Sequence, residues 1–157
     1  MAFAKFVPAL QLSIRAAAAA ALSLLIAQQL GLQYPIYAMI AGVIVIDLSP
    51  QETRRLAWRR LAGTVIGSIL GGVLASVLPG GALSVGIGIL LAMLLSHLLR
   101  LPEAARIAGY LCAIVLLEHA VDQWIYAFWR FIETVLGIGV ALLVSQVPRM
   151  IRTETER

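Results

Sequence analysis

The sequence Arg60-Leu-Ala-Gly-Thr-Val-Ile-Gly67 begins an apolar segment that extends to Leu78, and a similar sequence follows 70 positions later. This second copy, Arg130-Phe-Ile-Glu-Thr-Val-Leu-Gly137, has Arg, Thr, Val and Gly at the same offsets, and the same shift brings Asp47 within one position of Glu118. It also aligns three apolar pairs: Ala38 with Ala108, Ile44 with Ile114, and Val45 with Val115. The matches predict an internal repeat; the alternative is chance similarity between apolar helices.

The apolar segments around these two copies predict six membrane-spanning helices. Four of them, at residues 13–30, 61–78, 82–99 and 126–147, reach the roughly 18 residues expected of a spanning helix. Two others, at 34–48 and 107–119, are shorter than a hydrocarbon layer of about 30 Å requires at about 1.5 Å per residue. We count both as spans, because otherwise the basic segments 54–60 and 100–106 would lie on the side of the membrane opposite to the basic residues near the two termini.

The distribution of basic residues predicts the orientation of these spans. With six spans and the N-terminus inside, 11 of the 12 Lys and Arg residues lie on the cytoplasmic side, as the positive-inside rule expects. These are Lys5, Arg15, Arg54, Arg55, Arg59, Arg60, Arg100, Arg106, Arg149, Arg152 and Arg157. Only Arg130 remains near the outer side. Both termini are therefore predicted to be cytoplasmic, in a multi-pass protein of the plasma (inner) membrane.

Composition argues against other protein classes. Hydrophobic residues make up 61% of the chain and charged residues 13%, whereas roughly 45–50% apolar content is usual in soluble domains. One Cys and two His residues provide no metal cluster, so neither metal nor cofactor is expected. The basic residues flank apolar segments instead of forming an exposed face, so lipid head groups are expected partners and nucleic acid is not. No nucleophile–base set or phosphate-binding loop occurs, so no enzyme is predicted.

The repeat and the spans together predict a single membrane domain over residues 1–157. Repeat one covers about 13–78 and repeat two about 82–147, with an interfacial segment at 1–12 and a cytoplasmic tail at 148–157. The segment 1–12 has an alternative interpretation as an extension of the first helix, and the first span could instead be a signal peptide. Three spans per repeat place the second copy upside down relative to the first. The predicted fold is an all-α integral membrane protein with a 3+3 inverted repeat.

Two parts of the chain resemble a known family. Tyr34-Pro-Ile-Tyr-Ala-Met-Ile-Ala-Gly-Val-Ile-Val-Ile-Asp-Leu-Ser-Pro50, followed by Arg60 to Gly67, resembles the second span, turn and Arg-x-x-Gly-Thr-x-x-Gly helix of the aromatic acid exporter or fusaric-acid-resistance-like proteins. Leu99-Arg-Leu-Pro-Glu103 and Trp129-Arg-Phe-Ile-Glu-Thr-Val-Leu-Gly137 are similar to a subgroup with one six-span unit. The resemblance covers about residues 10 to 148 and implies efflux of aromatic or other weak organic acids, sometimes with a periplasmic adaptor.

The repeated Arg and Thr positions are the candidate substrate-binding residues: Arg60, Thr64, Arg130 and Thr134. A guanidinium binds a carboxylate through two parallel hydrogen bonds, and Arg60 and Arg130 begin the predicted third and sixth spans from opposite sides. For Arg60 the alternative role is a topology anchor. For Arg130 the alternative is an ion pair with Glu133, three residues further along the same helix face.

Acidic residues near the membrane are the candidate proton-coupling groups, because ionisable groups at membrane depth commonly mark an ion or substrate path. Asp47, Glu118 and Glu133 are the main candidates, with His119 and Asp122 beside Glu118. The alternatives are an interfacial position for Asp47, ordinary loop solvation for Glu118, and the ion pair for Glu133.

Glycines recur every fourth residue at Gly63, Gly67 and Gly71, which we call the glycine ridge. A looser version on the sixth span consists of Gly137, Gly139, Ala141 and Ser145. Small residues at this spacing allow helices to pack closely, either within one protomer or between copies.

These features predict a proton-coupled secondary transporter that exports weak organic acids. A homo-oligomer is also expected, because six short helices enclose little cavity alone. Two other classes remain open at this point. One is an organic or inorganic anion channel, in which the arginines supply a positive potential without proton coupling. The other is a non-transporting membrane subunit that packs into a larger complex.

Overall fold

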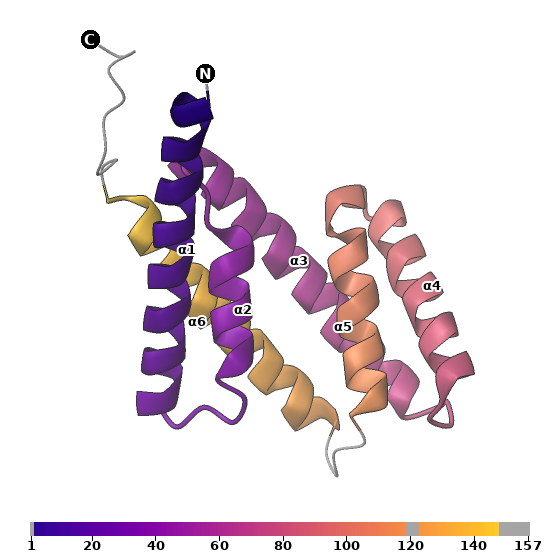
Figure 1. The fold of residues 1–157 in the computed structure, drawn as a ribbon. Coiled ribbons are helices and arrows are strands. Elements are labelled where there is room, and N and C mark those ends of the chain that lie inside the picture. The colour runs from indigo at the N-terminus through magenta and orange to yellow at the C-terminus, as the bar shows by residue number, and fades with distance from the viewer. Residues whose placement is uncertain (1, 119–122, 148–157) are drawn as a thin grey trace. The chain divides into compact units, whose positions relative to one another are not determined.

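The computed structural model describes residues 2–118 and 123–147 of the 157-residue chain, and within these residues the regular structure is helical (Figure 1). The all-α prediction is therefore confirmed. The elements in chain order are α1 (Ala2–Gln29), α2 (Ile36–Val45), α3 (Pro50–Ala75), α4 (Ala82–Leu98), the 3₁₀ helix η1 (Pro102–Ala104), α5 (Ala105–Leu117) and α6 (Gln123–Ser145).

The helix starts differ from one expectation. Arg60 and Arg130 were expected to begin the third and sixth spans, but α3 starts ten residues before Arg60 and α6 seven residues before Arg130. Pro50 stands at the first position of α3, where its fixed φ angle and missing N–H suit the start of a helix. The basic segment is consequently part of the helix, and both arginines lie well inside their helices.

Two helices within the described residues are long and apolar enough to cross a membrane, at Phe6–Gln29 and Trp124–Ser145. Ile36–Val45 and Ala82–Leu98 are apolar but shorter. At about 1.5 Å per residue, the 10 residues of α2 and the 13 of α5 extend only about 15 and 20 Å. The second segment is thus shorter still as a helix, because α2 already ends at Val45, whereas α5 has the 13 residues predicted for the fifth segment.

Large apolar side chains are exposed on the outside of these helices. Leu83 and Leu98 of α4 are each 80% exposed, and Leu25, Ile69 and Leu143 are more than half exposed on α1, α3 and α6. Water-soluble monomers rarely expose apolar surface to this extent. Such a surface suits the hydrocarbon region of a lipid bilayer.

The chain divides into two compact units. The first contains the described residues up to Ala57 together with those from Val135 onwards, and the second contains those from Trp58 to Thr134. Helices α3 and α6 each contribute one part to either unit. The predicted repeats at 13–78 and 82–147 divide the chain by sequence similarity, so their boundaries differ from those of the two compact units. The repeat stays a prediction.

In the first unit, α1 and α2 lie side by side and run in opposite directions (Figure 1). The C-terminal part of α6 packs on α2, where Gly137 is in contact with the backbone carbonyl of Ala38. Helix α1 continues without a break from Ala2 through Pro8 to Gln29. The interfacial placement of residues 1–12 stays a prediction. The predicted tail at 148–157 lies outside the described residues.

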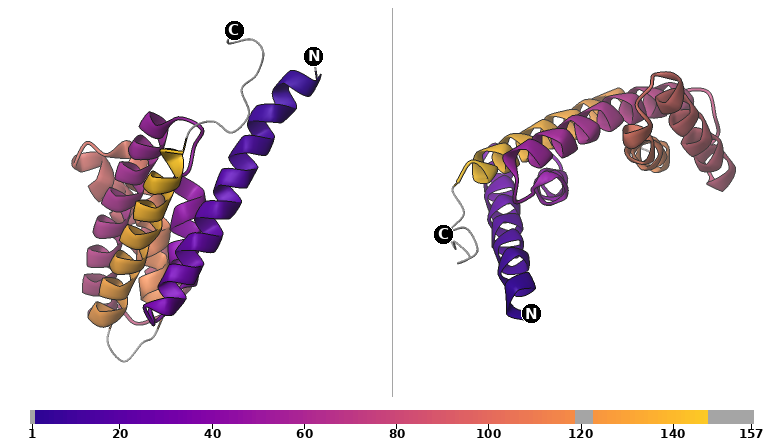
Figure 2. Two further views of the ribbon diagram at one scale, coloured as in Figure 1. Left: turned by 90° about the vertical axis from the view of Figure 1, so that its left-hand side faces the viewer. Right: turned by 90° about the horizontal axis from the view of Figure 1, so that it is seen from above.

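In the second unit, α4 and α5 lie next to each other, as the view from above in Figure 2 shows. Helix α5 also packs against α3 through the predicted glycine ridge. A β-carbon built on Gly63, Gly67 or Gly71 would come within 3 Å of an atom of α5 or of η1. The buried core between α3, α4 and α5 consists of Ile66, Ala92, Ala108, Cys112 and Leu116.

Candidate functional site

The second unit buries two arginines and one glutamate inside an apolar helix layer. Arg60 of α3 and Arg130 of α6 are each 1% exposed, and Glu133 of α6 is fully buried. Charged side chains are almost never fully buried unless they are paired, because a buried charge loses its hydration. These three residues are therefore the unit's strongest candidates for function.

Arg130 is paired with Glu133. The distance from Arg130 Nη2 to Glu133 Oε2 is 2.5 Å, and the two residues lie one helical turn apart on the same face of α6. One turn earlier, the ring of Tyr126 lies under the guanidinium, with its centroid 5.0 Å from Arg130 Cζ. The ion pair that the sequence offered as one alternative is thus present, and a cation–π contact supports it.

Arg60 has a different environment. Its Cζ lies 5.3 Å from the ring centroid of Tyr110 on α5, and its side chain experiences the positive charge of Arg130. Its Nε and Nη1 atoms have no hydrogen-bond partner among the described residues. A guanidinium carries five N–H donors, so Arg60 retains donors that an additional acceptor can use.

The charges of this set do not balance. Two guanidinium groups and one carboxylate leave one surplus positive charge, and each guanidinium has a tyrosine ring beside it. A planar anion with an aromatic ring would supply the missing negative charge, accept hydrogen bonds from Arg60, and contact apolar ring surfaces. The arrangement is thus chemically suited to an aromatic carboxylate.

The two candidate threonines are buried beside this set. Thr64 is fully buried, and its hydroxyl donates to the backbone carbonyl of Arg60 at 2.8 Å, one turn earlier on α3. Thr134 follows Glu133 on α6 and is 1% exposed. Because the Thr64 proton already has an acceptor within the helix, this hydroxyl can only accept a further bond.

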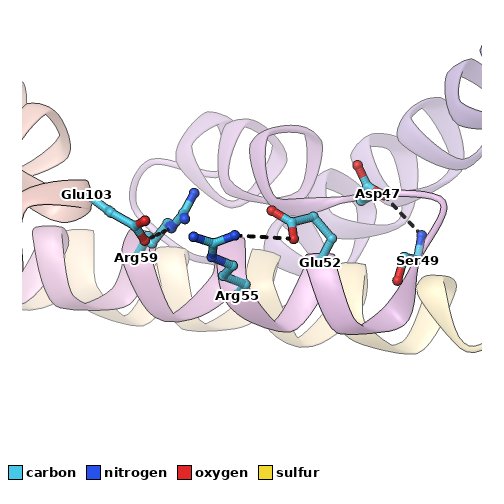
Figure 3. A network of polar contacts seen from close by, with 6 residues as sticks. All are labelled: Asp47, Ser49, Glu52, Arg55, Arg59 and Glu103. Atoms are coloured by element: carbon cyan, nitrogen blue, oxygen red, sulfur yellow. Dashed lines mark hydrogen bonds and ion pairs between the residues drawn. The ribbon is translucent and has the colours of Figure 1, made fainter.

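Asp47 organises a turn in the first unit. Its Oδ1 accepts a hydrogen bond from the Ser49 N–H at 3.0 Å (Figure 3). Its own N–H donates to Thr53 Oγ1 at 3.0 Å. This local bonding fixes the chain immediately before α3, which gives Asp47 a structural task. Glu118 follows α5 in the second unit and is exposed, while His119 and Asp122 lie outside the described residues.

The basic segment of α3 carries ion pairs at the surface. Arg55 Nη1 lies 3.9 Å from Glu52 Oε2 within the first turns of α3, and Arg59 pairs with Glu103 of η1 (Figure 3). The pair formed by Arg59 ties η1 to α3 within the second unit. The exposed pair of Arg55 with Glu52 contributes little to stability, about 0 to 1 kcal/mol. Arg60, the residue after Arg59, is by contrast buried.

Sequence reasoning missed the two tyrosines and the role of Arg15. Tyr126 precedes Arg130 by four residues, a helical spacing that predicts contact, whereas Tyr110 has no comparable local signal. Arg15 was counted only for topology. It is 7% exposed and donates to three backbone carbonyls of the first unit: those of Asp47 at 3.5 Å, Leu48 at 3.0 Å and Val147 at 2.6 Å.

Comparison with known proteins gives one finding on the family. The family model described as aromatic acid exporter family member 1 matches residues 12–147. No curated protein and no solved structure matches the chain. The matched range includes both candidate arginines, both tyrosines and Glu133.

Proposed function

The chain belongs to the aromatic acid exporter family, and from this premise we propose that it exports aromatic or other weak organic acids across the inner membrane by proton-coupled secondary transport. Membership indicates a membrane protein that transports organic acids and does not indicate an enzyme. The direction of transport, the coupling to protons and the residues involved are the finer parts of the proposal.

One observation carries the proposed site: a buried group in which Arg60 and Arg130 outnumber Glu133. Arg60 has unused hydrogen-bond donors, so we assign it as the first contact of the substrate carboxylate. Tyr110 and Tyr126 would flank the substrate ring. Binding of a monoanion would bring this group to zero net charge and lower the cost of its burial.

Glu133 is the proposed proton-coupling group. While Glu133 is ionised, it holds Arg130 at 2.5 Å. A proton on Glu133 would weaken this pair and allow Arg130 to turn to the substrate carboxylate, as a second clamp beside Arg60. Loss of that proton would restore the pair, so that Arg130 returns to Glu133 and the anion is held by Arg60 alone. The protonation state of Glu133 would therefore set how tightly the anion is held.

For the architecture we propose six spans arranged as a 3+3 inverted repeat with cytoplasmic termini. Two kinds of observation support it. Helices α3 and α6 end at Ala75 and Ser145, 70 positions apart. The contact of Gly67 with Ala108 in the second unit also has a counterpart at the same shift, the contact of Gly137 with Ala38 in the first. Transporters built in this way place their substrate site near the bilayer midplane.

The partners belong to the proposal as well. The exposed leucines on the outer helix faces would contact lipid acyl chains. A homo-oligomer, and a periplasmic adaptor as in some exporters that the chain resembles, would complete the path through the cell envelope.

Proteoliposomes test this function. Counterflow of radiolabelled benzoate should appear with wild-type protein and should be competed by other aromatic carboxylates. An imposed pH gradient should drive net flux. As a matched control for Arg60, Arg54→Gln changes an exposed arginine of the same helix and should leave both signals unchanged. Anion conductance without pH-driven accumulation would indicate a channel, and the absence of any flux would indicate a non-transporting subunit. Either result would overturn the proposal.

A further inference from the structure

The second unit also contains a cavity, on a different face of α6 from Arg130. It has a volume of about 350 Å³ and is lined by residues of α3 and α6: Val65, Ser68, Ile69, Trp124, Ala127, Phe128 and Phe131. At about 100° per residue, Phe128 and Arg130 point to opposite sides of α6. The cavity is therefore distinct from the group formed by Arg60, Arg130 and Glu133, and we call it the aromatic pocket.

Ser68 provides the pocket's polar group. It is 5% exposed, and its Oγ atom has no hydrogen-bond partner among the described residues. Hydroxyls within apolar helices usually donate to the carbonyl one turn earlier. Thr64 and Ser96 of this chain do so, to Arg60 and Ala92. Since Ser68 makes no such bond, its hydroxyl is available to a molecule in the pocket, and a buried hydroxyl left unpaired is unfavourable.

The lining selects the chemistry of the occupant. Trp124, Phe128 and Phe131 supply three aromatic rings, and none of the seven lining residues is charged. An ionised carboxylate would lose its hydration here without a cation to replace it. A protonated carboxylic acid has no charge, and its hydroxyl and carbonyl can pair with the hydroxyl of Ser68. Its aromatic ring can pack against the three rings by edge or offset stacking.

We propose that the aromatic pocket binds the undissociated form of an aromatic carboxylic acid, taken from the lipid phase. This inference rests on the substrate class of the proposed function and adds a second site to it. The neutral acid is the form that partitions into a bilayer, and the exposed sides of Ile69, Trp124 and Phe128 give access from the helix surface. The same compound would thus meet two sites, its neutral form at Ser68 and its anion at Arg60.

The fluorescence of Trp124 provides a direct binding test that needs no transport. A variant with Trp58→Phe and Trp129→Phe keeps Trp124 as the sole tryptophan. Titration of this protein in detergent with benzoic acid should change Trp124 emission saturably. The apparent affinity should fall about tenfold per pH unit above the acid's pKa of about 4, because only the neutral form binds. An affinity that does not change with pH would overturn the proposal.

Two substitutions and a control test the role of the pocket. Ser68→Ala should weaken binding about fivefold, the effect of one neutral hydrogen bond, and Ala127→Phe should abolish binding by filling the space. Ser23→Ala is the matched control. Ser23 is a buried serine whose Oγ also has no partner among the described residues, but it belongs to the first unit and does not line the pocket. Unchanged binding in both Ser68→Ala and Ala127→Phe would overturn the proposal.

The ligand panel excludes a general lipid groove. Benzamide, a neutral aromatic compound with hydrogen-bonding groups, should compete with benzoic acid, whereas octanoic acid should compete only weakly. Equal competition by octanoic acid would assign the pocket to acyl chains and overturn our proposal. Failure of the proposed transport function looks different: binding at Trp124 would persist in a protein that shows no benzoate counterflow.

Discussion

Gly67 lies directly against the backbone carbonyl of Ala108: a β-carbon added to this glycine would be 2.5 Å from the carbonyl oxygen. Gly137 lies 70 positions after Gly67, and Ala38 lies 70 positions before Ala108. These two residues make the same kind of contact, between Gly137 and the carbonyl of Ala38. Both contacts join a long helix, α3 or α6, to one of the short helices, α5 or α2. Because backbone atoms cannot move aside as a flexible side chain can, glycine is the residue that these crossings require.

We predict that Gly67→Ala destabilises the protein by about 1 to 3 kcal/mol, since α3 must move away from α5 to accommodate the methyl group. The midpoint of thermal unfolding in detergent measures this effect. Gly139→Ala is the matched control on α6, because no atom lies within 4 Å of its added carbon. This control should be neutral or slightly stabilising, as alanine is the better helix former. Equal midpoints for the two variants would contradict the close crossing.

A second prediction concerns Arg15, whose guanidinium joins three parts of the first unit by donating to the carbonyls of Asp47, Leu48 and Val147. Arg15→Lys keeps the charge but removes the planar arrangement of donors, so at most part of this bonding survives. Backbone amides around Leu48 and at the C-terminal end of α6 should then exchange with deuterium faster. Arg54→Lys, at an exposed position of α3, should leave the exchange unchanged. Identical exchange in both variants would show that Arg15 does not hold these segments.

A third prediction tests the proposed topology. After Cys112→Ala, single cysteines at Gly31, Gly80 and Asp122 should react with an impermeant maleimide from outside the cell. Cysteines at Gln51, Glu103 and Thr155 should react only from the cytoplasmic side. The reason is the positive-inside distribution of basic residues across six spans. A residue that reacts from the opposite side would contradict the six-span arrangement.

Much of the helical fold was predictable because apolar segments give a strong local signal. Helix α4 starts at the predicted residue, Ala82, and ends at Leu98, one residue before the predicted end. Both boundaries have a local signal, because a Pro-Gly-Gly turn precedes Ala82 and Arg100 follows the helix. The start of α3 was less accessible to hydropathy. Its first turns contain Glu52 and several arginines, so no apolar run marks them, yet helix formation depends on backbone bonding and tolerates charges on an exposed face.

The site was predictable only in part. The three-residue spacing of Arg130 and Glu133 on one helix predicted their ion pair as an alternative, and a local rule of this kind applies whatever the tertiary structure. The contact of Arg60 with Tyr110 depends on the packing of α3 against α5, and no spacing along the sequence encodes it. Ser68 differs from Thr64 and Ser96 through a bond that it does not make, which sequence does not reveal.

A fourth prediction assigns Arg60 to the substrate. Because Arg60 Nε and Nη1 have no partner within the described residues, Arg60→Lys should leave the folded protein largely intact. Benzoate counterflow should nevertheless fall about tenfold or more, since an ammonium group cannot form the paired hydrogen bonds of a guanidinium with a carboxylate. Arg54→Lys should transport at the wild-type rate. Wild-type counterflow in Arg60→Lys would remove this residue from the proposed site.

The last prediction separates coupling from stability at Glu133, whose carboxylate is buried and paired with Arg130. Glu133→Gln cannot exchange a proton in the physiological range, so a coupling role predicts that counterflow persists while accumulation driven by a pH gradient is lost. A purely structural role predicts a different result, because an unpaired Arg130 would remain in an apolar layer. The protein would then lose about 3 kcal/mol of stability or more, and Arg130→Met would restore it in the double variant. Measuring unfolding midpoints, counterflow and gradient-driven flux for both single variants and the double variant distinguishes these cases. Full gradient-driven accumulation by Glu133→Gln would exclude this glutamate as the coupling group.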